Sequence, residues 1–239
     1  MCLRADKLLS NMGYGSRKDV KKLLKQGGFT ANGETIKDGK KHVDPNKDTL
    51  VIMGEPVEYR EFIYLIMNKP KGYVSATEDK NEATVIDILE PEDSIFQPFP
   101  VGRLDKDTTG LLLLTNDGKL AHQLTSPKKK VDKMYLVDLD HSVSQEDIVA
   151  LENGVILDDG YETKPAKVEL VDEYNSTRVY ITIQEGKYHQ VKRMFQTRGN
   201  KVIRLERIRM GPLHLDPTLE LGTYRELTED ELSMLMQNE

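Results

Sequence analysis

The segment VGRLDKDTTGLLLLTNDG, residues 101–118, places a dense group of charges directly before four leucines. Arg103, Asp105 and Asp107 fall within five positions, and Leu111–Leu114 have the length and flanks of a buried strand. A carboxylate on a loop anchored to a buried strand is rigidly placed, and polar groups on such scaffolds often do chemistry. Alternatively, both aspartates are turn residues and Arg103 is a surface ion-pair partner. Spacing alone leaves the two interpretations open.

The chain offers no pattern for a metal or cofactor. Its five histidines are scattered without ligand spacing, and its one cysteine, Cys2, allows no internal disulfide and no cysteine-based metal cluster. We therefore expect neither a metal nor a cofactor. No apolar run is long enough to span a membrane and no signal-peptide core is visible, so we expect a cytoplasmic protein without membrane contact. Because no coiled-coil repeat is present, we also expect a monomer.

Charge is distributed unevenly along the chain. The net charge is −6, yet residues 1–41 hold ten Lys or Arg against four Asp or Glu, a local charge of +6 that leaves −12 for the remainder. Within that acidic remainder, one basic cluster spans residues 128–133, and residues 187–209 hold eight Lys or Arg against the single acid Glu206. One such cluster is typical of a solvated surface, but three in one chain favour a phosphate-binding surface.

The basic N-terminal segment has the plan of a small helical module. Ser16 and Asp19 have the spacing of a capping box, Gly27 ends the helix, and Asn32-Gly33 predicts a hairpin. This order of helix, turn, basic helix and hairpin over residues 1–58 resembles the S4-type RNA-binding domain. Such a domain implies binding to structured RNA through phosphates and shape. The basic residues that we expect to contact RNA here are Arg4, Arg17, Lys18, Lys21, Lys22 and Lys25.

Residues 59–239 mix strands and helices without a regular alternation. This pattern predicts an α+β domain built on a largely antiparallel sheet flanked by helices, and we predict a linker over residues 54–61. The predicted strands cover residues 62–68, 110–116, 133–140, 166–173, 177–185 and 201–208. The predicted helices cover residues 118–126, 144–153, 189–199 and 229–236.

A resemblance decides between the two interpretations of the charged loop. GRLDKDTTGLLLLTNDG is similar to the signature loop of the RNA pseudouridine synthases of the RsuA/RluA superfamily, whose aspartate falls on Asp105. The similarity continues through MNKPKGYVSAT, LTSPKKKVDKMYLV, TKPAKVEL, EGKYHQVKRMF and GTYRELTEDEL. Together with the S4-like module, these motifs resemble the branch that modifies ribosomal RNA. KYHQVKRM and TKPA are most similar to the members that act on the small subunit.

The resemblance implies that a uridine in RNA is isomerised to pseudouridine. The bond from ribose C1′ to uracil N1 breaks, the base rotates, and C1′ joins C5, so the substrate brings every atom and no cofactor is needed. The implied target is 16S rRNA, alone or in a small-subunit assembly intermediate, at the uridine-516-type site of that family. The alternative target is 23S rRNA, because members acting on it share every motif quoted above.

The resemblance also assigns catalytic roles. Asp105 matches the residue that initiates glycosidic cleavage, either as a nucleophile or by stabilising positive charge at C1′. Lys192 matches the basic partner that would keep Asp105 ionised, although many family members have arginine there. Tyr135 matches the tyrosine that stacks on the target uracil.

Extruding the target nucleotide from folded RNA requires further contacts. Arg103 matches the family position whose side chain enters the vacated stack, while Leu205 is either the apolar wall of the pocket or a core residue. Gly102 and Gly110 would allow close backbone approach. Leu104, Gln190 and Arg193 complete the expected substrate-binding set, and Lys187 is expected to contact RNA.

Some positions and functions stay open. Lys69 and Lys71 are either RNA contacts or solvated lysines, and we expect His189 to be a structural residue or a phosphate contact rather than a general base. One rival is a non-catalytic S4-type ribosome-binding protein. Another is a glycosidase-like hydrolase with Asp105 and Asp107 as its carboxylate pair, which is less favoured because alternate residues of an extended loop face opposite ways.

Overall fold

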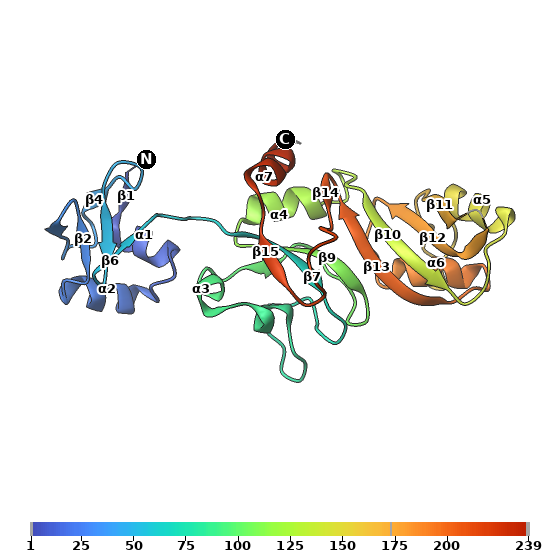
Figure 1. Cartoon of the computed structure of the whole chain (residues 1–239), viewed down its shortest axis with the longest axis horizontal. Coiled ribbons are helices and arrows are strands. Elements are labelled where there is room, and N and C mark those ends of the chain that lie inside the picture. The colour runs from blue at the N-terminus through green and yellow to red at the C-terminus, as the bar shows by residue number, and fades with distance from the viewer. Residues whose placement is uncertain (1, 173, 238–239) are drawn as a thin grey trace. The chain divides into compact units, whose positions relative to one another are not determined.

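The computed structural model describes residues 2–172 and 174–237, and its contacts divide the chain into two compact units (Figure 1). The first unit comprises Met1–Ile63 with Leu89–Pro98, and the second comprises Tyr64–Ile88 with Phe99–Glu239. The first unit therefore extends a few residues beyond the expected boundary at residue 58, and it includes residues 89–98, which were expected in the second domain. Among the described residues, no helix is long and apolar enough to cross a membrane.

The first unit contains the short helices α1, α2 and α3 and two small sheets. Ser16 Oγ accepts from the amide of Asp19 while the Asp19 carboxylate accepts from the amide of Ser16, which confirms the predicted capping box. Leu8 and Phe29 are fully buried in its core. A four-stranded sheet has the order β3-β2-β5-β6, and β1 pairs with β4. The bounds are β1 Leu3–Arg4, α1 Ala5–Asn11, α2 Arg17–Lys25, β2 Phe29–Ala31, β3 Glu34–Thr35, β4 His42–Val43, β5 Leu50–Ile52, β6 Glu55–Val57 and α3 Pro91–Ser94.

The turn predicted at Asn32-Gly33 is confirmed, whereas the predicted linker is partly wrong. Asn32 and Gly33 have φ of 52° and 79°, the left-handed values that a two-residue hairpin between β2 and β3 requires. Residues 55–57 of the expected linker form β6. Pro56 lacks an amide donor, but β6 is the edge strand of its sheet, where a proline is tolerated.

The second unit is built on one nine-stranded sheet. Its main order is β11-β12-β10-β13-β9-β7-β15, with β14 added on β13 and β8 on β9. The described pairs are antiparallel except β9–β13, so the prediction of a largely antiparallel α+β domain is confirmed. Its strands are β7 Tyr64–Lys69, β8 Phe99–Pro100, β9 Thr109–Thr115, β10 Lys133–Leu139, β11 Lys167–Asp172, β12 Asn175–Ile183, β13 Val202–Met210, β14 Leu213–His214 and β15 Tyr224–Glu226.

The predicted strands and helices of this unit are all present, with bounds shifted by a few residues. The predicted strand 166–173 corresponds to β11, and its last residue, Glu173, lies outside the described residues. The short strands β8, β14 and β15 and the 3-10 helix Val85–Ile88 were not predicted. The helices are α4 Gly118–Thr125, α5 Gln145–Asn153, α6 Gln190–Thr197 and α7 Glu229–Met236.

Strand β9 is the buried centre of this sheet, as the leucine run predicts. Each of its seven residues is buried, because both faces of the strand are covered. On one face Leu111 and Leu113 pack with Leu120 and Leu124 of α4 and with Leu235 of α7. A strand fixed in this way gives the charged loop before it a rigid base.

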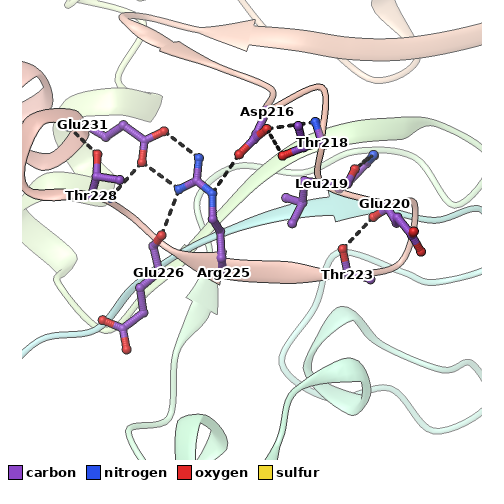
Figure 2. A network of polar contacts seen from close by, with 10 residues as sticks. Asp216, Thr218, Leu219, Glu220, Thr223, Arg225, Glu226, Thr228 and Glu231 are labelled. Carbon is purple, nitrogen blue, oxygen red and sulfur yellow. Dashed lines mark hydrogen bonds and ion pairs between the residues drawn. The ribbon is translucent and has the colours of Figure 1, made fainter.

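The C-terminal segment is pinned to the edge of the sheet by one arginine. Arg225 on β15 donates two hydrogen bonds to the Glu231 carboxylate, at 2.8 and 2.9 Å, and its Nε donates to Asp216 at 3.0 Å (Figure 2). Glu231 also completes a capping box with Thr228 at the start of α7. Nearby, Asn68 Nδ2 of β7 donates to the carbonyl of Leu219. These contacts tie α7 and the segment around Asp216 to β15, which pairs with β7.

Candidate active site

The charged loop enters β9 through a position that only glycine can occupy. Gly110 has φ of +99°, and a Cβ added there would lie 2.3 Å from the carbonyl oxygen of Arg207 on β13. The absence of a side chain lets β9 approach β13 where these strands pair in parallel. Gly102, at the other end of the loop, also has a positive φ, of 75°. Gly110 therefore fits the expected close backbone approach, whereas a Cβ at Gly102 would make only an ordinary contact of 3.5 Å with the Thr125 side chain.

A buried lysine, Lys69, binds the backbone carbonyls of the same loop. Lys69 Nζ donates to the carbonyls of Asp105 and Thr108, at 3.1 and 3.0 Å, and to that of Pro70 at 3.0 Å, with a longer contact of 3.4 Å to Lys106. Its side chain is fully buried, so both sequence interpretations of Lys69, an RNA contact or a solvated lysine, are wrong. Burial lowers the pKa of this lysine to about 8, against the attraction of nearby carboxylates.

The Asp105 carboxylate lies against the first turn of α6. Lys192 Nζ is 3.1 Å from Asp105 Oδ2 and 2.6 Å from Asp107 Oδ1, so one cation bridges both acids. Burial lowers the pKa of Lys192, but its hydrogen bonds to the two carboxylates outweigh this effect and the net shift is upward. His189 Nε2 lies 3.7 Å from Asp105 Oδ1, beyond hydrogen-bond distance, and its ring stacks on Tyr188. The expected pairing of Asp105 with Lys192 is thus present in the structure.

A small cavity of about 70 Å³, here called the Asp105 cavity, opens above this carboxylate. Tyr135 lines it from β10, where it pairs with Ile181 of β12 and Arg207 of β13. Leu205, two residues before Arg207, lines the same cavity and is otherwise buried, so it is both a wall and a core residue. The expected residues that line this cavity are Arg103, Leu104, Asp105, Tyr135, Lys187, Gln190 and Leu205.

One support of this cavity was missed by sequence reasoning. The buried Ser75 Oγ accepts from the amide of Leu104 at 3.1 Å and donates to the carbonyl of the same residue at 3.0 Å. The two hydrogen bonds fix the backbone directly before Asp105. Ser75 belongs to MNKPKGYVSAT, a motif that carried the family resemblance, but no spacing rule links a serine to a loop far along the chain.

Two residues expected to bind substrate are held by protein partners instead. Gln190 Nε2 donates to the buried Glu185 at 2.6 Å, and its Oε1 accepts from the amide of Lys187 at 2.9 Å. Arg193 forms ion pairs with Asp158 and Asp159 and does not line the Asp105 cavity. Gln190 therefore shapes the cavity wall, while the guanidinium of Arg193 is already occupied by acids.

The first unit carries a separate basic cleft of about 670 Å³, called the N-terminal cleft. Seven Lys or Arg line it against two aspartates, Asp6 and Asp38. Of the RNA contacts predicted in this unit, Lys18 and Lys22 lie on the exposed surface and do not line the cleft. The cationic lining is Arg4, Lys7, Arg17, Lys21, Lys25, Lys37 and Lys40, of which Lys7, Lys37 and Lys40 were not predicted.

Comparison with known proteins defines the class. The family described as RNA pseudouridylate synthase matches residues 63–197, and the S4 domain matches residues 3–48. The chain therefore belongs to the RNA pseudouridylate synthase family and carries an S4 domain. It is an enzyme that acts on RNA, as the signature loop around Asp105 indicated.

Individual relatives cover almost the whole chain. An uncharacterised RNA pseudouridine synthase of Bacillus subtilis is 57% identical over 234 residues, which are 98% of each chain. A ribosomal small subunit pseudouridine synthase A of Yersinia pestis is 40% identical, covering 97% of each chain. A crystal structure of a pseudouridylate synthase aligns with a TM-score of 0.68 and 38% identity over 98% of this chain and 99% of the other.

Proposed function

We propose that this enzyme converts a uridine of 16S rRNA to pseudouridine, with Asp105, Tyr135 and Lys192 as its catalytic residues. The observation that carries the proposal is the Asp105–Lys192 ion pair at 3.1 Å, which lies beside a cavity walled by an aromatic ring and a leucine. The carboxylate is partly exposed, at 26% of its side chain, so it is both positioned and accessible.

The proposed reaction needs a carboxylate that is kept charged and rigid. Asp105 acts at C1′ as the C1′–N1 bond breaks, either by forming a covalent adduct or by stabilising the positive charge that develops there. Lys192 compensates its charge, and Lys69 fixes the backbone carbonyls of the loop. The freed uracil rotates, C1′ joins C5, N1 gains a proton and C5 loses one, so atoms balance without a co-reactant.

Tyr135 and Arg103 are proposed to hold the extruded nucleotide. The buried ring of Tyr135 faces the Asp105 cavity between two neighbouring strands, which suits stacking on a planar base. Arg103 is exposed at the mouth of the cavity and makes no ion pair with any described residue, so its guanidinium is available to enter the vacated stack. Leu205 forms the apolar wall of the Asp105 cavity.

The 16S target is supported by the relatives. Four proteins named ribosomal small subunit pseudouridine synthase A, from Yersinia pestis, Haemophilus influenzae, Pasteurella multocida and Vibrio cholerae, are 39–41% identical over nearly the full chain. Seven cations line the N-terminal cleft, and the six besides Arg4, which pairs with Asp6, are offered to the phosphates of folded RNA. The alternative substrate, 23S rRNA, is an outcome of the test below.

Pseudouridine mapping tests both the 16S rRNA target and the catalytic role of Asp105. Unmodified 16S rRNA and partly assembled small subunits are incubated with wild-type protein, Asp105→Asn or Asp107→Asn, and pseudouridines are located by carbodiimide labelling and primer extension. Asp107 shares Lys192 with Asp105 but is 69% exposed, so it is the matched control. We expect one new site with wild type and Asp107→Asn, and none with Asp105→Asn. A site on 23S rRNA alone would refute the 16S target, and modification by Asp105→Asn would refute the catalytic role of Asp105.

The role of the N-terminal cleft is tested by salt dependence. Lys21→Gln and Lys25→Gln remove cleft cations, whereas Lys22→Gln removes an exposed cation of the same helix that does not line the cleft. Each lost phosphate contact lowers the slope of log K against log salt by about 0.7–0.9. We expect this decrease for the first two variants and an unchanged slope for the control. Equal salt slopes for all three variants would show that RNA does not bind in the N-terminal cleft.

A further inference from the structure

A buried arginine beside the Asp105 cavity has an unused hydrogen-bond donor. Arg207 is only 2% exposed, and its Nε donates to the carbonyl of Leu111 at 2.8 Å. Its Nη2 has no hydrogen-bond partner among the described residues. An unsatisfied buried donor on a charged group is costly, so native structures normally provide a hydrogen-bond acceptor for it, from the protein, an ordered water or a ligand. Arg207 therefore indicates a site for an anion or another acceptor.

The groups around Arg207 are also cationic. Lys133 on the neighbouring strand is 9% exposed, and its Nζ donates to the carbonyl of Val131 at 2.8 Å. Burial lowers the pKa of Lys133, and repulsion from Arg207 and Lys164 lowers it further, while Asp132 opposes the shift. Concentrated like charges repel one another, and a bound anion relieves that repulsion.

These cations line a cleft of about 420 Å³, called the Arg207 cleft. Its acidic lining residue is Glu185, whose carboxylate already accepts from Tyr161 Oη at 2.8 Å, from the amide of Lys164 at 3.0 Å and from Gln190 Nε2 at 2.6 Å. Glu185 therefore orders the wall and forms no ion pair with the cations. The cationic lining is Arg103, Lys133, Lys164, Lys187 and Arg207.

The Arg207 cleft adjoins the Asp105 cavity. Arg103, Tyr135 and Lys187 line both, and Tyr135 pairs directly with Arg207 across β10 and β13. A strand that places a uridine in the Asp105 cavity must carry a phosphodiester on each side of that nucleotide. A guanidinium fork and two ammonium groups suit the oxygens of such a phosphate.

We propose that the Arg207 cleft is a phosphate site that binds a backbone phosphodiester next to the target uridine. This proposal rests on the proposed function only for the identity of that nucleotide. The site acts by positioning: once the phosphate is bound, C1′ is held at a fixed place relative to Asp105. Its chemistry is recognition of a phosphate by buried cations, without any base contact.

The test is an NMR titration of the full-length ¹⁵N-labelled protein with three probes. The probes are the trinucleotide UpUpU, the same trinucleotide with neutral methylphosphonate linkages, and inorganic phosphate. The reporters are the Nε–H of Arg207 and the amides of Lys164 and Gly186. We expect UpUpU to shift these signals, and the neutral analogue to bind at least tenfold more weakly there. Inorganic phosphate should shift the same signals with lower affinity.

Substitutions test whether the cations of the Arg207 cleft bind UpUpU. Lys164→Gln removes a partly exposed cation of the cleft, and Lys167→Gln is its control, because Lys167 is 67% exposed, pairs with Glu169 and does not line the cleft. We expect UpUpU binding to weaken about three- to tenfold for Lys164→Gln and to be unchanged for Lys167→Gln. Arg207→Gln should weaken it further. If that variant does not fold, the Lys164 comparison decides alone.

Three results would overturn the proposal. They are equal binding of the neutral analogue, shifts confined to the N-terminal cleft, and a response to inorganic phosphate without any response to UpUpU. The experiment does not depend on catalysis. Binding at the cleft by a protein that makes no pseudouridine would refute the proposed function alone, and pseudouridine formation without binding at the cleft would refute the phosphate site alone.

Discussion

Replacing Lys69 by methionine should change the pH dependence of stability in a defined direction. The pKa of Lys69 falls from 10.5 in the unfolded chain to about 8 in the folded protein, because burial disfavours the ammonium. Between these values the unfolded state binds more protons, so stability rises with pH. The contribution of Lys69 is therefore largest above pH 10.5 and is lost as pH falls through 8. Methionine has a similar volume and does not titrate.

The structure sets the size of the stability loss at pH 7 and of its change between pH 7 and 9.5. At pH 7 the substitution removes hydrogen bonds to three carbonyls at 3.0–3.1 Å, and the partial offset from removing a buried charge leaves a loss of about 2 kcal/mol. From pH 7 to 9.5 the wild type then gains about 2 kcal/mol relative to Lys69→Met, since the proton leaves the folded state about 1.5 units below pH 9.5.

Urea unfolding of both proteins at pH 7 and 9.5 measures this difference. Other titrating groups are present in both proteins, so they cancel in the comparison. We expect the stability gap to widen from about 2 to about 4 kcal/mol. A gap that stays constant would show that the pKa of Lys69 is not lowered.

Three further predictions concern Lys192, Gly110 and Arg225. Lys192→Gln should lower the single-turnover rate constant of pseudouridine formation about 100-fold, and Lys192→Arg should lower it less than tenfold. Only the former substitution leaves the two carboxylates without a cation. Gly110→Ala should lose about 3 kcal/mol or more in urea unfolding, because its Cβ meets a carbonyl at 2.3 Å, whereas Gly118→Ala, with no atom within 4 Å, should lose none. Arg225→Met should lose about 1–2 kcal/mol in the same assay and shift α7, because the bidentate pair with Glu231 is partly exposed.

The elements that follow strong local rules were predicted from the sequence. The leucine run became a strand buried on both faces, and Ser16 with Asp19 formed the capping box that their spacing requires. Short strands such as β15 were missed, because Tyr224–Glu226 has no hydrophobic alternation and forms only by pairing with β7. Residues 55–57 were predicted to lie in a linker, but they form the edge strand β6, where Pro56 is tolerated.

Some side chains of the site are positioned by long-range polar contacts, and their positions could not be predicted from sequence patterns. Lys69 looks like a loop lysine, yet tertiary packing directs it into the carbonyls of a loop 36 residues away. Arg207 belongs to the basic run of residues 187–209, which predicted a surface cluster. Its side chain instead lies on the buried face of β13, while Arg204 is exposed. A charge run along a strand therefore contains both solvated and buried cations.

The most direct test of an isomerisation initiated by Asp105 is tritium release from RNA labelled at uracil C5. Joining C1′ to C5 displaces the hydrogen at that carbon, so each pseudouridine formed releases one tritium to water while uracil stays attached. We expect release by the wild type and by Asp107→Asn, no release by Asp105→Asn, and no free uracil with any of them. Release by Asp105→Asn at the wild-type rate, or loss of free uracil, would contradict an isomerisation initiated by Asp105.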